Sequence, residues 1–145
     1  MDLKFKNGEI KNVTEFLKYE KEINFVEKLE KLFCRLYGVK YAIACNSGTS
    51  ALHASLASLG LKKNDEVIVP ALGVVMGAYA AIHLGLKPVF VDVNKDTFLI
   101  DCENIKKKIT KRTKAIMTIS LQGLPVQIDP ILKLAKKKNI KVIED

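Results

Sequence analysis

Three hydroxyl side chains surround a glycine in the stretch Ser47-Gly48-Thr49-Ser50, which follows an apolar run and directly precedes a helical pattern. The first N–H groups of a helix have no internal acceptor, and the helix dipole adds partial positive charge beside them. Glycine lets a ligand approach the backbone closely, and the hydroxyls can supply further hydrogen bonds. The stretch therefore predicts an anion site of the kind that holds a phosphate group.

Simple capping is the alternative interpretation, because serine and threonine before a helix often only cap its first turn. Two other phosphate motifs are excluded by the residues. No Gly-Lys-Ser/Thr follows, as a P-loop requires, and Gly48 stands alone where a dinucleotide fingerprint needs three spaced glycines.

The composition predicts one ordinary folded domain. The chain has 145 residues, of which 48% are hydrophobic and 28% charged, with a net charge of +8. The lysines are spread through helical patterns, so we expect solvated helix faces at 106–108 and 136–138 and no nucleic-acid partner. Three cysteines without paired spacing and two histidines predict reduced thiols, a cytoplasmic protein and no metal site.

The uncharged stretch from Val67 to Leu86 raises the alternative of a membrane span. Pro70 interrupts the stretch, and a β-branched run precedes it. We therefore expect a strand, a loop and a buried helix that ends near Gly85, with no membrane segment.

Apolar spacing and turn residues predict a β-α alternation. The expected helices are 15–37, ended by Gly38; 49–59, closed by Gly60; 72–84; a short one after the cap Asp101, through Ile109; and 128–138, with Ile131, Leu132 and Ala135 facing inward. The expected strands are 41–45, 66–69, 89–93, 114–120 and 141–145. This order predicts an α/β fold in one domain over residues 1–145, with a mostly parallel sheet, helices on both faces, and a helical extension over residues 1–26.

The sequence resembles the sugar aminotransferases of the DegT/DnrJ/EryC1/StrS family, which depend on pyridoxal 5'-phosphate. The resemblance runs from about Glu27 to Asp145. Its motifs are 37–42, 46–53, 65–72, 85–93, 112–116, 123–125 and 142–145. No single motif identifies the family, but the order and spacing of these motifs together are specific to it.

The resemblance implies the incomplete large domain of a pyridoxal-phosphate transferase. Gly48, Thr49 and Ser50 match the turn that holds the cofactor phosphate, and Asp145 matches the aspartate that pairs with the pyridine nitrogen. It further implies a nucleotide-sugar substrate, an amino donor such as glutamate or glutamine, and a homodimer in the complete protein. Without the resemblance, Asp145 would be interpreted as a frayed acidic terminus.

Several residues depart from the family pattern. Val74 stands where an aromatic residue usually covers the cofactor ring, and Gly73, Met76 and Gly77 also differ. Ser120 and Gln122 replace the usual histidine and tyrosine, and Val126-Gln127 replaces Ala-Asp. We therefore expect Val74 to pack against the ring without stacking.

The family's Schiff-base lysine lies downstream of the position of Asp145, so we assign no catalytic residue within the chain. The expected function is that of the N-terminal part of an aminotransferase acting on a nucleotide-linked keto-sugar. Two alternatives stay open. One is a sugar dehydratase of the same family, and the other is a non-catalytic remnant or dimerisation partner that keeps the phosphate turn.

Overall fold

The computed structural model describes residues 7–18 and 24–145 of the chain. The chain divides into two compact units, one over residues 1–44 and the other over residues 45–145. The second unit contains the whole sheet and all the predicted cofactor residues.

The described part of the first unit contains two helices, α1 (Asn7–Lys18) and α2 (Phe25–Tyr37), followed by a non-helical segment. The Asn24 side chain caps α2 by accepting a 3.0 Å hydrogen bond from the backbone N–H of Glu27. Gly38 ends α2 with a left-handed φ of 62°, as predicted. The prediction of one helix over residues 15–37 is wrong, because the Asn24 cap starts a new helix; residues 19–23 lie outside the description.

The segment 41–45 is not a strand, which corrects the prediction of a buried one. Tyr41 is 74% exposed and Ile43 is 81% exposed. No strand among the described residues pairs with this segment. A strand is completed by hydrogen bonds to a neighbour, so an apolar run without one stays extended but unpaired.

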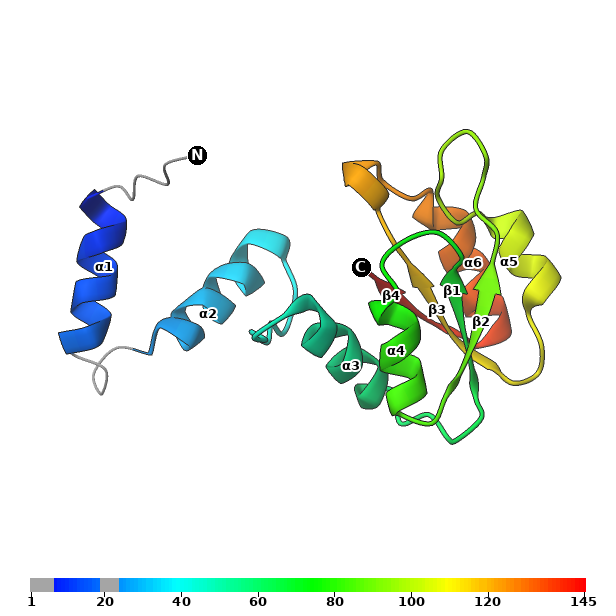
Figure 1. Ribbon diagram of the computed structural model, residues 1–145, viewed down its shortest axis with the longest axis horizontal. Coiled ribbons are helices and arrows are strands. Elements are labelled where there is room, and N and C mark those ends of the chain that lie inside the picture. Colours follow the sequence, from blue (N-terminus) through cyan, green and yellow to red (C-terminus); the bar gives the residue numbers. More distant parts are fainter. Residues whose placement is uncertain (1–6, 19–23) are drawn as a thin grey trace. The chain divides into compact units, whose positions relative to one another are not determined.

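Four parallel strands form the sheet of the second unit (Figure 1). They are β1 (Glu66–Pro70), β2 (Lys87–Val91), β3 (Thr113–Thr118) and β4 (Lys141–Glu144), in the spatial order β2-β1-β3-β4. The predicted parallel α/β architecture is therefore confirmed. The two central strands carry short continuous apolar runs, Val67–Val69 in β1 and Ala115–Met117 in β3, because both of their faces are covered.

Helices cover both faces of the sheet. The helices α3 (Gly48–Ser58) and α4 (Met76–His83) pack on one face, where Leu52 and Leu56 meet Val67, Val69 and Met117. The helices α5 (Cys102–Lys108) and α6 (Ile128–Lys138) pack on the other, around Ile68, Ile116 and Ile131. A 3-10 turn, η1 (Leu121–Gly123), precedes α6.

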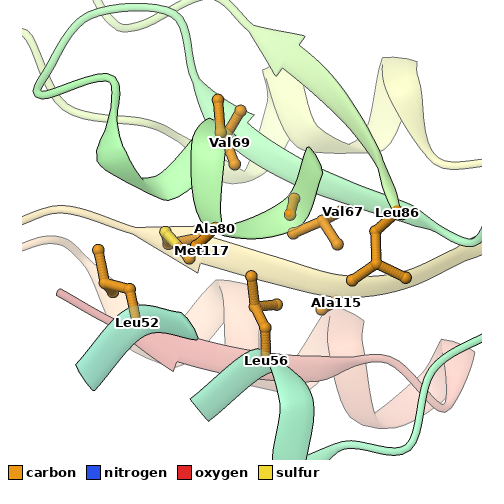
Figure 2. Close-up of a cluster of buried hydrophobic side chains, with 10 residues drawn as sticks. Leu52, Leu56, Val67, Val69, Ala80, Leu86, Ala115 and Met117 are labelled. Carbon is orange, nitrogen blue, oxygen red and sulfur yellow. The ribbon is translucent and has the colours of Figure 1, made fainter. Parts of the chain in front are cut away.

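The direction of α3 matters for the site. Figure 2 shows Leu52 toward the Met117 end of β3 and Leu56 toward Ala115. The helix therefore runs against the strands, and its first turn lies at the edge where the strands end. Its last turn leads through residues 59–65 to the beginning of β1.

Two details differ from the predicted core. The helix α4 begins at Met76, and Leu72 before it is 44% exposed. Leu132 is 46% exposed on α6, whereas Ile131 and Ala135 are buried as predicted. Among the described residues, no helix is both long enough and apolar enough to cross a membrane.

Candidate functional site

The predicted cofactor residues all belong to the edge of the sheet where the strands end. Gly48, Thr49 and Ser50 form the first turn of α3, Val74 lies between β1 and α4, and Asp145 directly follows β4. In parallel α/β folds, ligands bind at this edge.

In the first turn of α3, some backbone N–H groups donate to the N-cap residue and others face solvent. The Ser47 hydroxyl oxygen accepts a 3.1 Å hydrogen bond from the backbone N–H of Ser50, and it lies 3.0 Å from the Ser50 hydroxyl oxygen. The carbonyl of Ser47 accepts from the N–H of Ala51 at 3.1 Å. Ser47 is therefore the N-cap, and Ser50 is partly committed to it.

The backbone N–H groups of Gly48 and Thr49 have no acceptor among the described residues. Both residues are exposed. An added Cβ at Gly48 would meet no atom within 4 Å, so the space beside the turn is open. Two unpaired N–H groups at a helix start, in open space and beside the Thr49 hydroxyl, suit a phosphate dianion.

Two backbone hydrogen bonds hold Asp145 in place. Its N–H donates to the carbonyl of Thr118 at 2.9 Å, and its carbonyl accepts from the N–H of Ser120 at 3.2 Å. These bonds continue the parallel pairing of β3 and β4 by one residue. Among the described residues, Asp145 is exposed and none of the ion pairs involves its carboxylate.

Val74 lies beside a small apolar cavity. Val74 is 67% exposed. The cavity has a volume of about 90 Å³, and its lining also includes Gly73, Met117 and Ile119. The sulfur of Met117 would lie 2.5 Å from a Cβ added at Gly77. The glycine therefore lets Met117 pack directly against the backbone of α4.

No hydrogen bond or ion pair joins the α3 turn, Val74 and Asp145 to one another in the described part of the chain. Sequence reasoning missed Ser120 as a backbone partner of Asp145 and Met117 and Ile119 as neighbours of Val74. The register of strand pairing brings these residues together, and spacing along the chain carries no signal for it. No cluster of three or more metal-ligating side chains occurs among the residues described.

Comparison with known proteins decides the family. The model of the DegT/DnrJ/EryC1/StrS aminotransferase family matches residues 4–145. The chain belongs to this family. The resemblance noted from the motifs is therefore confirmed over nearly the whole sequence.

Relatives within the family are longer than this chain. The GDP-perosamine synthase of Caulobacter vibrioides is 46% identical over 121 residues, which are 83% of this chain and 33% of that protein. The structure of an aminotransferase from Psychrobacter cryohalolentis matches with a TM-score of 0.91 and 34% identity, over 99% of this chain and 37% of that one. The chain thus spans about a third of the length of these relatives.

A family structure with different chemistry matches almost as well. The E. coli GDP-4-keto-6-deoxy-D-mannose-3-dehydratase with bound hydrated PLP has a TM-score of 0.89 and 33% identity, over 99% of this chain and 39% of that one. The family fold over these residues is therefore shared by an aminotransferase and a dehydratase.

Proposed function

We propose that the chain is the cofactor-phosphate-binding part of a pyridoxal-phosphate aminotransferase that acts on a nucleotide-linked keto-sugar. The observation that carries the proposal is the pair of unpaired N–H groups at Gly48 and Thr49, in a chain that belongs to an aminotransferase family. The similarity to a GDP-perosamine synthase supports the substrate class.

When bound, pyridoxal phosphate supplies a protonated pyridine ring that accepts electrons from the substrate carbon. The N–H groups of Gly48 and Thr49 and the Thr49 hydroxyl, at the start of α3, would hold the phosphate by charge-assisted hydrogen bonds. The Asp145 carboxylate would accept the hydrogen bond of the ring N–H and so favour the protonated ring. Val74 would supply an apolar contact to the ring.

The reaction also needs a lysine amine to move a proton at the substrate carbon. Within the described residues, no lysine bonds to Asp145 or to the α3 turn. Lys95, in the turn after β2, pairs with Asp96 at 2.8 Å. We therefore assign no catalytic lysine to this chain, and the proposed transamination with glutamate or glutamine is that of a protein of the relatives' length.

A dehydratase is the second candidate, favoured by the similarity to the E. coli 3-dehydratase. The two reactions differ in their products. An amino-sugar formed from a GDP-linked 4-keto-sugar and glutamate by a protein of full family length would support the aminotransferase, and a 3-deoxy-sugar would support the dehydratase.

The third candidate is a non-catalytic remnant or a dimerisation partner. Turnover of a keto-sugar by a protein of full family length would separate the enzyme from this candidate, and a cofactor titration of this chain tests the phosphate turn that both candidates share. Pyridoxamine 5'-phosphate is the best probe, because its amine cannot react with the many surface lysines. Amide NMR signals of Gly48 and Thr49 should shift saturably, with a millimolar Kd, roughly −4 kcal/mol.

Two variants and one control sharpen this titration. Thr49→Val removes a hydroxyl and should weaken both pyridoxamine phosphate and inorganic phosphate. Asp145→Asn should weaken only the ring-bearing ligand. Ser58→Ala, at the other end of α3, is the control and should change neither affinity. The absence of any shift at Gly48 and Thr49 would contradict the proposed phosphate turn.

The proposed partners are a nucleotide-sugar, an amino donor and a second copy of the protein. A cytoplasmic location stays a prediction from the cysteine pattern.

A further inference from the structure

Charges in the second unit are separated along the strand direction. Most of its basic residues lie where strands begin or helices end, at Lys62, Lys63, Lys87, Lys106, Lys107, Lys108, Lys111, Arg112, Lys114, Lys136, Lys137, Lys138 and Lys141. This edge is opposite the one that carries the α3 turn and Asp145. Most acidic residues lie at that other edge, at Asp92, Asp96, Asp101, Glu103, Asp129, Glu144 and Asp145.

Helix dipoles explain only part of this separation. Lysines in the last turns of α5 and α6 complement the negative ends of those helices. Lys111 lies in the loop between α5 and β3, and Lys114 lies on β3, so neither stabilises a helix end. Their positions need another reason.

Lys111 and Lys114 line a hollow of about 380 Å³ together with Lys138 at the end of α6. Thr110 and Thr113 and the apolar side chains of Ile109 and Ile140 complete its wall. The Lys114 ammonium donates to the carbonyl of Lys111 at 3.0 Å, which holds the two residues together. None of the three lysines pairs with a carboxylate among the described residues.

The nearby carboxylate does not neutralise these lysines. Glu66 is buried and accepts hydrogen bonds from Thr110, Thr113 and Arg112. The two threonine hydroxyl protons are therefore committed to Glu66, and the lysine ammonium groups are the donors that remain for a ligand in the hollow. Three cations around a hollow larger than a single phosphate needs favour a ligand with more than one anionic group.

We propose that this lysine hollow, lined by Lys111, Lys114 and Lys138, is a second binding site, for a small molecule that carries two or more phosphate groups. The site is independent of the proposed function, because it uses none of the residues at the α3 turn or Asp145.

The test is a calorimetric titration of the protein with inorganic pyrophosphate at constant ionic strength. Saturable binding is expected, with amide NMR shifts at Lys111, Lys114 and Lys138 in the unmodified protein, at pyrophosphate concentrations below those that shift Gly48 and Thr49. The triple variant Lys111→Gln, Lys114→Gln, Lys138→Gln should weaken the affinity by about tenfold or more, because charge-assisted hydrogen bonds are the strong ones.

The matched control is Lys108→Gln, Lys136→Gln, Lys137→Gln, which removes the same charge from the same edge without touching the wall of the hollow. It should weaken pyrophosphate less than about threefold, since exposed charges act weakly through solvent. Equal losses in the two triple variants would overturn the proposal in favour of general attraction to polyanions such as nucleic acid. Non-saturable binding, or shifts confined to Gly48 and Thr49, would also overturn it.

Discussion

The Oε1 atom of Glu66 lies 3.1 Å from the Nη2 atom of Arg112, and this contact joins the beginning of β1 to the residue that precedes β3. The Glu66 side chain is only 3% exposed. Hydroxyl groups of Thr110 and Thr113 also donate to it, and the Lys87 ammonium of β2 lies 3.7 Å away. One buried carboxylate thus connects three neighbouring strands.

Replacing Glu66 by glutamine should therefore destabilise the fold. The amide loses the charge and turns an NH₂ group toward donors, which leaves buried hydrogen bonds unmade. We expect a loss of about 1–3 kcal/mol in the free energy of unfolding, measured by urea denaturation. Glu27→Gln is the control, because Glu27 and its partner Lys31 are exposed; its midpoint should barely move. Equal shifts for the two variants would contradict the assigned role.

The same carboxylate should make stability depend on pH. The hydrogen bond from Thr110 lowers the pKa of Glu66 below its ordinary value of 4.5, and the hydrogen bond and charge of Arg112 and the charge of Lys87 act in the same direction, against the opposing effect of burial. Because the folded pKa lies below the unfolded one, this stabilisation is present above about pH 4.5 and is lost as the pH falls through the folded value. Unfolding free energies measured from pH 6 to about pH 3 should show this loss, and its slope should be smaller in Glu66→Gln. An unchanged slope would exclude Glu66 as its source.

Replacement by alanine should change the stability of the fold differently at two glycines near the site. At Gly77 a Cβ would lie 2.5 Å from the Met117 sulfur, so Gly77→Ala overpacks the core and should cost about 1–3 kcal/mol of stability. At Gly48 a Cβ meets nothing, so Gly48→Ala should be neutral or slightly stabilising. Thermal denaturation compares the two. The double variant Gly77→Ala, Met117→Val should recover part of the loss, and its failure to do so would show that the contact with Met117 is not the cause.

The exposed face of α4 should form a contact between two copies of the protein. Val75, Tyr79 and Ile82 recur at helical spacing and are each about half exposed, at 49%, 47% and 51%. Ile82→Lys should shift a dimer toward monomer in sedimentation experiments, because it places a charge in an apolar contact. The control is Leu132→Lys on α6. Leu132 is 46% exposed, close to the 51% of Ile82, and its replacement should leave the assembly unchanged. A monomeric wild-type protein at high concentration would contradict this prediction.

Local chemistry made several parts of this protein predictable from sequence. Gly38 ends a helix because it tolerates the left-handed conformation there, and Asp101 caps α5 through a 2.8 Å bond from the N–H of Asn104. The helix start at Gly48 was predictable for the same reason, and its role as a phosphate site stays a prediction. A helix start exposes N–H groups whatever lies elsewhere in the fold, so Gly48 and Thr49 could be identified from four consecutive residues.

Features that depend on partners distant in sequence were decided by the tertiary structure. The apolar run 41–45 has the composition of a strand, but no described strand lies beside it to complete its hydrogen bonds. Asp145 would be a frayed terminus by sequence alone, yet the register of β4 against β3 ties its backbone to Thr118 and Ser120. Likewise, Lys111, Lys114 and Lys138 surround one hollow only because the end of α6 lies against the beginning of β3. Spacing along the chain records which residues are neighbours within one helix or strand, whereas packing between elements determines which of them meet.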